Sequence, residues 1–240
     1  KNRYLNSKLK IFDLQKEKNF AVINKNLKKE FIKNKFLGKL LFPRIKDYRK
    51  IKKKIKNSYL NSNINEENMS FVFTLSKLLK ISEKSFIKTM KSFKGLSHRF
   101  EIFLKSGNIT FINDSKATSF TAAETALHSL KNIYWILGGL PKKNDKLKLS
   151  KLKKNIIKCY VIGKNINFFK DKIKDKVDFS ITKNLKNSII NISKDIKLQK
   201  HTNKSILLSP GAASFDQFEN FEKRGEEFKR LCKKYVRKFI

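Results

Sequence analysis

The chain has 240 residues, of which 40% are hydrophobic and 21 are Phe, so it is long enough to bury one large core or two smaller ones. Its formal net charge of +37 is extreme, but lysine is spread along the whole chain together with much Asn, Ile and Phe, which favours a coding bias over dedicated binding of nucleic acid. No apolar run reaches the roughly 20 residues that span a bilayer and no signal-peptide pattern opens the chain, which excludes membrane insertion and predicts a cytoplasmic location.

Residues 1–60 alternate apolar islands with lysine-rich connections, and the island at residues 20–23 predicts a buried strand. Two helical stripes follow, formed by Phe71, Leu75, Leu78 and Leu79 and then by Phe86, Ile87, Met90 and Phe93. Two consecutive helices are typical of one side of an α/β layer. Gly95 is the expected hinge, because glycine tolerates unusual dihedral angles and the apolar pattern changes there from helical to strand-like. The sequence thus predicts a first domain over residues 1–94 and a second over residues 95–240.

The second domain has the rhythm of an α/β fold. Strand-like apolar runs appear at residues 109–112, 133–137, 160–162, 177–179 and 206–208. Most are separated by a segment long enough for a helix, which predicts a Rossmann-like domain with a mostly parallel sheet covered by helices. A helix is expected after residue 118, where Thr121 and Glu124 resemble a capping box. Residues 215–239 place most of their aromatic side chains near one face and predict a closing helix.

Polar turns follow four of these predicted strands, at residues 113–118, 138–142, 163–165 and 209–214. In a parallel sheet such turns share one edge, the edge at which ligands usually bind. The turns are rich in small residues, hydroxyls and lysines, and these groups suit an anionic substrate because backbone N–H and ammonium groups are both donors. In a chain with so many lysines, their position directly after a strand singles out Lys116 and Lys142.

Several chemical signatures are absent from the sequence. It contains neither a G-x-x-x-x-G-K-[ST] phosphate loop nor a G-x-G-x-x-G fingerprint, so the residues alone do not support an autonomous ATP-using enzyme. Cys159 and Cys232 lie far apart without partners at ligand spacing, and no set of His, Cys and carboxylate residues has metal-binding spacing, so neither a disulfide framework nor a metal site is expected. His98 and Arg99 precede Phe100, Glu101 and Ile102 and are candidates for the same edge of the sheet or for a cleft between domains.

Four motifs together resemble the Mur ligase family, specifically its D-glutamate-adding members. They are GLSHRFE at residues 95–101, FINDSKAT at 111–118, Gly138-Gly139 with Lys142, and SPGAASFDQF at 209–218 followed by NFEKRG at 220–225. Their order and spacing match across the whole second domain. Other Mur ligases carry a different motif in place of the Asn-Asp-Ser-Lys-Ala-Thr run, which disfavours them.

The resemblance implies an ATP-dependent acid–D-amino-acid ligase of peptidoglycan biosynthesis, and through it a role in cell-wall biogenesis, cell shape and cell division. ATP would phosphorylate the alanine carboxylate of UDP-N-acetylmuramoyl-L-alanine, and the amine of D-glutamate would attack the acyl phosphate. By motif match, D-glutamate would be held by Lys116, Thr118, Lys142, Ser214 and Phe221. The nucleotide would lie near Asn65, Asn68, His98, Arg99 and Asp114.

The first domain resembles the later part of the family's central ATPase domain, with Asn65 and Asn68 matching an H-N-x-x-N element in which Ile64 replaces the His. The family's N-terminal domain, phosphate loop and metal-binding residues have no counterpart. We therefore expect the C-terminal part of a longer enzyme that is monomeric at full length, binds Mg²⁺ through upstream residues and is inactive as this chain alone. Two alternatives stay open: a Mur-type ligase for another amino acid, and a basic nucleic-acid-binding module.

Overall fold

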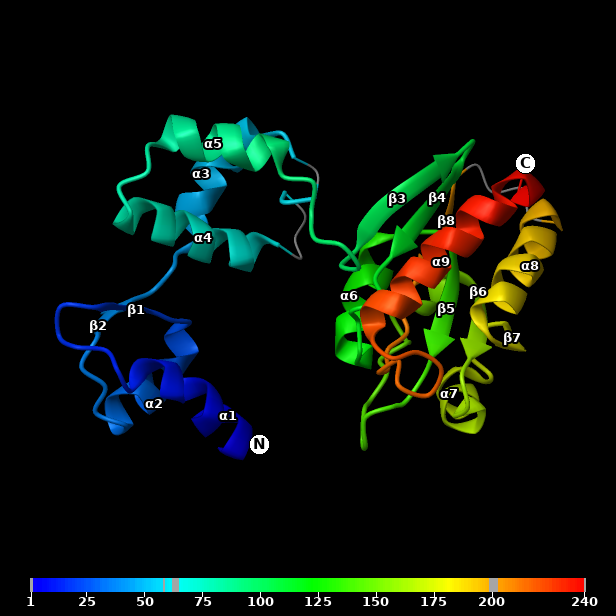
Figure 1. Ribbon diagram of the computed structural model, residues 1–240, viewed down its shortest axis with the longest axis horizontal. Coiled ribbons are helices and arrows are strands. Elements are labelled where there is room, and N and C mark those ends of the chain that lie inside the picture. Colours follow the sequence, from blue (N-terminus) through cyan, green and yellow to red (C-terminus); the bar gives the residue numbers. More distant parts are fainter. Residues whose placement is uncertain (1, 58, 62–64, 199–202, 240) are drawn as a thin grey trace. The chain divides into compact units, whose positions relative to one another are not determined.

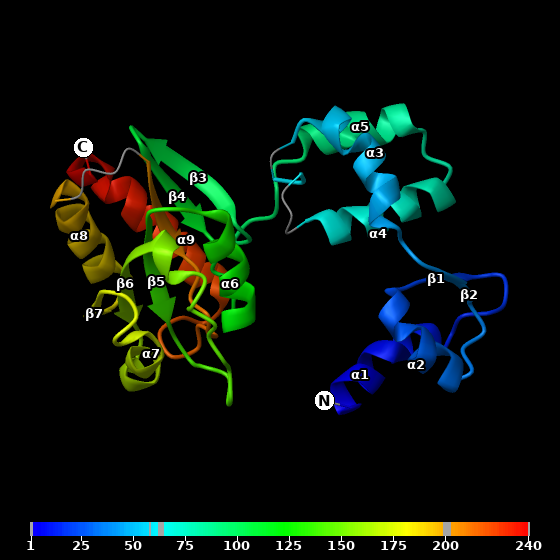
Figure 2. The ribbon, with the colours of Figure 1, turned by 180° about the vertical axis from the view of Figure 1, so that it is seen from behind.

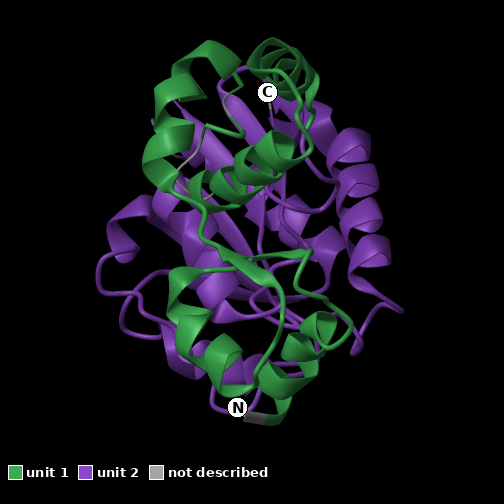
Figure 3. Ribbon diagram, turned by 90° about the vertical axis from the view of Figure 1, so that its left-hand side faces the viewer, with its two compact units in different colours: residues 1–94 green, residues 95–240 purple. Residues whose placement is uncertain are grey.

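The structure is a computed structural model that describes residues 2–57, 59–61, 65–198 and 203–239. They fall within two compact units, residues 1–94 and 95–240, each of which is described by itself (Figure 3). Among the described helices, none combines the length and the apolar character required to cross a lipid bilayer.

The first unit begins with a small α/β motif (Figure 1). Its elements are α1 (Asn2–Leu9), η1 (Lys10–Phe12), β1 (Phe20–Val22), η2 (Lys25–Leu27), α2 (Lys28–Lys33) and β2 (Lys39–Leu41). β1 and β2 pair in parallel, and Ala21, Ile23 and Phe31 form a small buried cluster beside them. Phe20 is 50% exposed, so the strand predicted at residues 20–23 is only partly buried, since a two-stranded sheet protects little of its surface.

Three helices complete the first unit: α3 (Ile45–Ile55), α4 (Glu66–Leu78) and α5 (Glu83–Ser92). They pack around one apolar core that consists of Tyr48, Ile51, Ile55, Leu60, Met69, Phe73 and Phe86. The two helices predicted from the apolar stripes are therefore present. Their buried faces pack against α3 rather than against a sheet, so the expectation of an α/β layer is wrong for this segment.

The second unit is built on a six-stranded sheet of order β3-β4-β8-β5-β6-β7. The strands are β3 (Glu101–Ser106), β4 (Ile109–Asn113), β5 (Ile133–Gly138), β6 (Ile156–Ile162), β7 (Phe179–Lys183) and β8 (Lys204–Leu208). All neighbouring pairs are parallel except β3 and β4, which form an antiparallel hairpin at the edge. The predicted mostly parallel α/β sheet is thus confirmed.

Helices cover both faces of this sheet (Figures 1 and 2). One face carries α6 (Phe120–Ser129) and α7 (Ile166–Ile173), and the other carries α8 (Leu185–Asp195) and α9 (Phe221–Tyr235). Along β5, Trp135 and Leu137 belong to the core under α6, whereas Tyr134 and Ile136 belong to the core under α9. Every residue of β5 is buried, which is why a strand enclosed on both faces appears in the sequence as a continuous apolar run. Short 3-10 turns flank these elements: η3 (Lys153–Asn155), η4 (Ile196–Leu198) and η5 (Val236–Phe239).

The start of two helices and the boundaries of two strands differ from the predicted ones, and helix caps explain the difference for the helices. α6 is capped by Ser119, whose Oγ accepts from the Ala122 N–H, so the capping box assigned to Thr121 and Glu124 is wrong. α9 begins at Phe221 rather than at residue 215, because Asn220 has an extended backbone and its Oδ1 accepts from the Lys223 N–H. β6 begins at residue 156 instead of 160, and β7 lies at 179–183 instead of 177–179.

Candidate functional site

The four polar turns meet at the carboxyl ends of β4, β8, β5 and β6, as the sequence predicts for a parallel sheet. Hydrogen bonds join each turn to the next: the Gly211 N–H donates to the Ala117 carbonyl over 2.9 Å and the Gly138 N–H to the Pro210 carbonyl over 3.0 Å. Leu140 and Ala213 exchange two backbone hydrogen bonds of 2.8 and 3.0 Å, and the Asn165 Nδ2 donates to the Gly139 carbonyl over 2.9 Å. We refer to residues 113–118, 138–142, 163–165 and 209–214 as the rim.

Two glycines allow the rim turns to approach so closely. Gly138 and Gly139 have φ angles of 135° and 133°, a conformation that other residues rarely adopt. A Cβ atom at residue 139 would collide with the Ala213 carbonyl oxygen, and one at residue 138 would collide with the Ile162 carbonyl oxygen. Close contact between the turns after β5 and β8 therefore requires glycine.

Asp114 lies at the start of the turn after β4, and its carboxylate is satisfied from two directions. One oxygen accepts from the Phe100 N–H over 3.1 Å, and the other accepts from the Ser209 hydroxyl over 2.8 Å. Burial raises the pKa of Asp114 to about 6, although these two hydrogen bonds and the nearby charge of Arg99 act in the opposite direction. The carboxylate is therefore mostly ionised at neutral pH, at a desolvation cost.

Lys116 is held in the middle of the same turn. Its backbone N–H donates to the His98 carbonyl over 3.0 Å, and its ammonium group lies 3.8 Å from the centre of the Phe221 ring, a cation–π contact. Phe221 is the first residue of α9, and its carbonyl accepts from the Ser115 hydroxyl over 2.8 Å. Two residues predicted to hold D-glutamate, one after β4 and one at the start of α9, thus lie in direct contact.

The other three residues predicted for D-glutamate are also on the rim. Thr118 is half-buried at the end of the turn after β4, Ser214 is only 2% exposed in the turn after β8, and Lys142 is exposed in the turn after β5. The structure therefore assembles all five predicted residues from three turns and one helix. Their role in binding stays a prediction.

His98 and Arg99 occupy a tight turn beside the rim. His98 and Phe100 have positive φ angles of 62° and 47°, which are unfavourable for side chains with a Cβ. The His98 ring is buried, with Nδ1 3.0 Å from the Asn113 Nδ2, and the Glu101 carboxylate accepts from both the His98 N–H and the Asn113 amide. This polar cluster fixes the turn and leaves Arg99 exposed at its tip.

Asn65 and Asn68 belong to the first unit and are described apart from the rim. Asn65 precedes α4 and its Nδ2 donates to the Tyr59 carbonyl over 2.9 Å, while Asn68 is exposed on α4. Ile64, the residue that replaces the family's His, lies outside the described residues. The predicted association of these two asparagines with Asp114 and Arg99 around one nucleotide remains a prediction.

Arg224 is the residue at this site that the sequence reasoning did not select. It lies in the first turns of α9 with 1% of its surface exposed, and its guanidinium donates to the Ser115 hydroxyl and to the Ser115 and Ala212 carbonyls. A signal was available: a cation near a helix N-terminus is unfavourable unless something compensates for it. That signal was lost among 57 basic residues.

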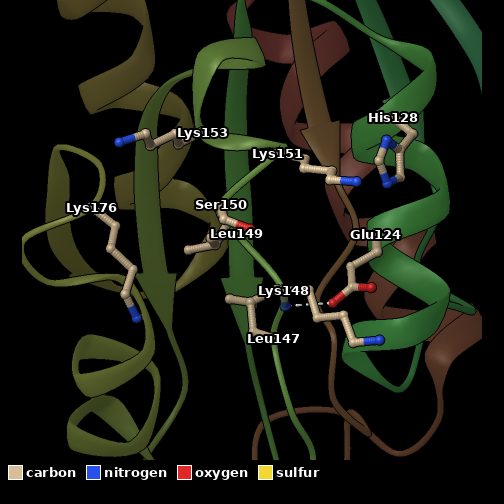
Figure 4. Close-up of a pocket in the computed structure, with 9 residues that line it drawn as sticks. All are labelled: Glu124, His128, Leu147, Lys148, Leu149, Ser150, Lys151, Lys153 and Lys176. Carbon is tan, nitrogen blue, oxygen red and sulfur yellow. Dashed lines mark hydrogen bonds between the residues drawn. The ribbon is translucent and has the colours of Figure 1, made fainter.

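A hollow of about 590 Å³ lies away from the rim, next to the residues that precede β6 and β7. It is lined by Glu124, His128, Leu147, Lys148, Leu149, Ser150, Lys151, Lys153 and Lys176. Figure 4 shows its lysines extending in different directions rather than converging on one point. In the part of the chain that the structure describes, no three His, Cys, Asp or Glu side chains are grouped so as to hold a metal ion.

Comparison with known structures identifies the class of fold. The chain superposes on a MurF ligase from Thermotoga maritima, solved in complex with ADP, with a TM-score of 0.61 at 14% identity, covering 97% of this chain and 58% of that one. The fold of this chain is thus found in a Mur ligase. No family model matches the chain.

Comparison of sequences then identifies relatives of this chain. The chain is 41% identical over 176 residues to a UDP-N-acetylmuramoylalanine–D-glutamate ligase of Wolbachia, covering 73% of this chain and 35% of that protein. It is 31% identical over 261 aligned positions to the ligase of the same name from Rickettsia prowazekii, covering 98% of this chain and 57% of that protein. The chain is thus homologous to D-glutamate-adding ligases of the Mur family. It spans roughly a third to just over half of the length of these relatives.

Proposed function

We propose that this chain contributes the D-glutamate site of an ATP-dependent ligase that joins D-glutamate to UDP-N-acetylmuramoyl-L-alanine. In this proposal residues 95–240 are the domain that binds D-glutamate, and residues 1–94 are the later portion of the central ATP-binding domain. The whole enzyme would act as a cytoplasmic monomer in peptidoglycan biosynthesis. The relatives' names support the reaction. The site is supported by the position of four predicted residues on one rim and by the contact of the fifth, Phe221, with Lys116.

The observation that carries the proposal is the chemistry gathered around Lys116. A dicarboxylate needs cationic and hydroxyl donors in fixed positions, and the rim carries the ammonium groups of Lys116 and Lys142 and the hydroxyls of Thr118 and Ser214. The Phe221 ring beneath the Lys116 ammonium restricts its position, so less conformational entropy is lost when a carboxylate binds.

The reaction needs no nucleophile from the protein. The amine of D-glutamate attacks the carbonyl carbon of an acyl phosphate, the C–N bond forms, phosphate leaves and the amine proton passes to solvent or phosphate. The rim residues would bind and orient D-glutamate, and the gain comes from holding the amine close to the activated carbon. Asp114, whose carboxylate accepts two hydrogen bonds and lies within the electrostatic influence of Arg99, would lie near the nucleotide together with Arg99, His98, Asn65 and Asn68.

ATP would be the phosphoryl donor, as the bound ADP of the Thermotoga relative suggests. The described residues provide no grouped set of side chains that could hold Mg²⁺. We expect its ligands in the portion of the relatives that this chain does not span. Accordingly, the 240-residue chain should bind D-glutamate without hydrolysing ATP or forming the amide. Ligation by the purified chain would contradict the proposal that the phosphoryl-transfer residues lie outside this chain.

Binding can be tested on the chain itself by NMR titration with D-glutamate, L-glutamate and a panel of other amino acids. D-glutamate should shift the resonances of residues 113–118 and 209–214 more than any other amino acid does. Lys116→Ala and Ser214→Ala should each weaken binding by roughly 10- to 100-fold, the loss expected for one hydrogen bond to a charged group. Lys105→Ala, which removes an exposed lysine of β3 away from the rim, is the matched control.

Activity can be tested by fusing the chain to the upstream portion of the Rickettsia prowazekii relative. In the fusion, the two rim variants should raise the KM for D-glutamate and leave the KM for the UDP-linked substrate unchanged. Unaltered D-glutamate kinetics in both variants would refute the assignment of the rim. Preferential binding of another amino acid would instead indicate a Mur-type ligase of different specificity.

A further inference from the structure

Arg224 is a buried cation that, within the described residues, forms no ion pair. Its Nε donates to the Ser115 hydroxyl over 3.0 Å, and its Nη2 donates to the Ser115 carbonyl over 2.8 Å and to the Ala212 carbonyl over 3.0 Å. Its Nη1 is buried without a hydrogen-bond partner among the described residues. A charge so enclosed normally lies against a carboxylate, and three neutral acceptors are an unusual substitute.

The burial of this guanidinium opposes folding. Desolvation lowers the pKa of Arg224 to about 10, with only the charge of Asp216 acting the other way, so the side chain still carries its positive charge at neutral pH. Well-packed apolar side chains in place of buried charges are often neutral or stabilising. Stability alone is therefore a weak reason for an arginine at this position.

The position of the guanidinium suggests what it does instead. Ser115 immediately precedes Lys116, and Ala212 lies two residues before Ser214, so the hydrogen bonds to the Ser115 and Ala212 carbonyls fix the backbones of the two turns that carry these side chains. A third turn lies close by, because a Cβ on Gly139 would lie 3.2 Å from Arg224 Nη1. One side chain of α9 thus forms hydrogen bonds with two of the four turns of the rim and lies close to a third.

Ser115 closes this arrangement into a loop. Its hydroxyl accepts from Arg224 Nε and donates to the carbonyl of Phe221, the residue whose ring lies beneath the Lys116 ammonium. The turn after β4 is therefore joined twice to the first turn of α9. Displacing Arg224 would therefore disturb the contact between Lys116 and Phe221.

We propose that Arg224 is a positioning residue that holds the turns at 113–118 and 209–214 together, so that their side chains can bind both carboxylates of one amino acid. Its unpaired positive charge lies directly beneath the rim and favours an anionic ligand there. This inference rests on the proposed function for the identity of the ligand but not for the role of Arg224 in holding the turns.

The test compares Arg224→Lys and Ser115→Ala with wild type and with Arg230→Lys in the 240-residue chain. Lysine keeps the charge of Arg224 but cannot reach both turns with a planar fork. Arg230 is the matched control, because it lies on the same helix but is exposed and paired with Glu227. Two quantities are measured at a temperature at which every variant is folded. They are the amide hydrogen exchange of each rim turn and the affinity for D-glutamate, the latter by NMR titration.

In folded Arg224→Lys, exchange of the amides in both turns should accelerate at least 10-fold while β5 keeps its protection, and the affinity for D-glutamate should fall roughly 10-fold. Ser115→Ala should move both quantities in the same direction by a smaller factor, and Arg230→Lys should move neither. A purely structural role would accelerate exchange across the whole sheet and leave the affinity of the folded fraction unchanged.

Exchange of the rim turns at the wild-type rate in folded Arg224→Lys would overturn the proposal. An Arg224→Lys affinity within two-fold of wild type would also overturn it, provided that Lys116→Ala weakens binding as expected. If Arg224→Lys does not fold, Ser115→Ala decides by the same two measurements. If wild type itself does not bind D-glutamate, the proposed function fails for this chain, and the holding of the turns is then decided by hydrogen exchange alone.

Discussion

The buried carboxylate of Asp114 should make the stability of the second unit depend on pH in an identifiable way. Its pKa of about 6 in the folded protein against an ordinary 3.8 corresponds to about 3 kcal/mol. Between these two values the folded state binds the proton more tightly than the unfolded state does. The contribution of Asp114 to the free energy of unfolding therefore falls as the pH rises from about 4 to about 6 and is constant above that range.

Asp114→Asn isolates this contribution because the amide keeps the shape and both hydrogen bonds. Its oxygen can accept from the Phe100 N–H, and its NH₂ group can donate to the Ser209 hydroxyl, which rotates to become the acceptor. The free energy of unfolding of the variant, minus that of wild type, should therefore rise by about 3 kcal/mol as the pH increases from about 4 to about 7.

The assay is urea unfolding at a series of pH values, followed by the fluorescence of Trp135. This is the only tryptophan of the chain, and it is fully buried in β5 with its Nε1 donating to the Ser209 carbonyl, so it reports on the second unit beside the rim. Asp171→Asn removes an exposed carboxylate of α7 and should follow the pH dependence of wild type. Parallel stability curves for wild type and Asp114→Asn across this pH range would refute the reasoning.

Two further predictions concern the packing of the second unit. Gly139→Ala should destabilise this unit by at least about 2 kcal/mol in the same urea assay, because the added methyl group meets the Ala213 carbonyl. Gly107→Ala is the control: its φ is 54° but the space around it is open, so it should cost only about 1 kcal/mol. Equal costs for the two variants would contradict the close approach of the rim turns. Cys159 and Cys232 are buried, and burial raises the pKa of both thiols. A thiol reagent should therefore label them only as fast as the second unit unfolds. Rapid labelling under native conditions would contradict their burial.

The parallel sheet and its rim were predictable because each rests on a local pattern. A strand enclosed on both faces must be apolar throughout, as β5 is, and the polar turn that follows marks its carboxyl end. The edge strand β3 was not predicted, since Ile102 is exposed and the strand is recognisable only through its pairing with β4. Likewise, α3 was hidden because Tyr48, Ile51 and Ile55 are scattered among lysines that resemble a connection.

Within the candidate site, sequence reasoning found the side chains that end on the rim and missed the one beneath it. Lys116 could be selected because it directly follows a strand. Arg224 lies more than one hundred residues later in the chain, and its contacts with Ser115 and Ala212 exist only once α9 has packed on the sheet. No local pattern distinguishes a buried arginine from an exposed one in a chain where charged residues are so frequent, because burial is a tertiary property.

The amount of positive charge therefore cannot by itself make the rim selective. With 57 lysines and arginines, an anion is attracted to most of the surface of this chain, and salt screens that attraction. Lys116 differs from other lysines because its ammonium is held over the Phe221 ring and its turn is tied to Arg224. Donors that folding has already ordered lose little further entropy when a ligand binds, and they match only an anion whose charges have the same spacing. In the proposed function, selectivity for a dicarboxylate in so basic a chain would come from such fixed donors, and we propose the buried guanidinium of Arg224 as the group that fixes them.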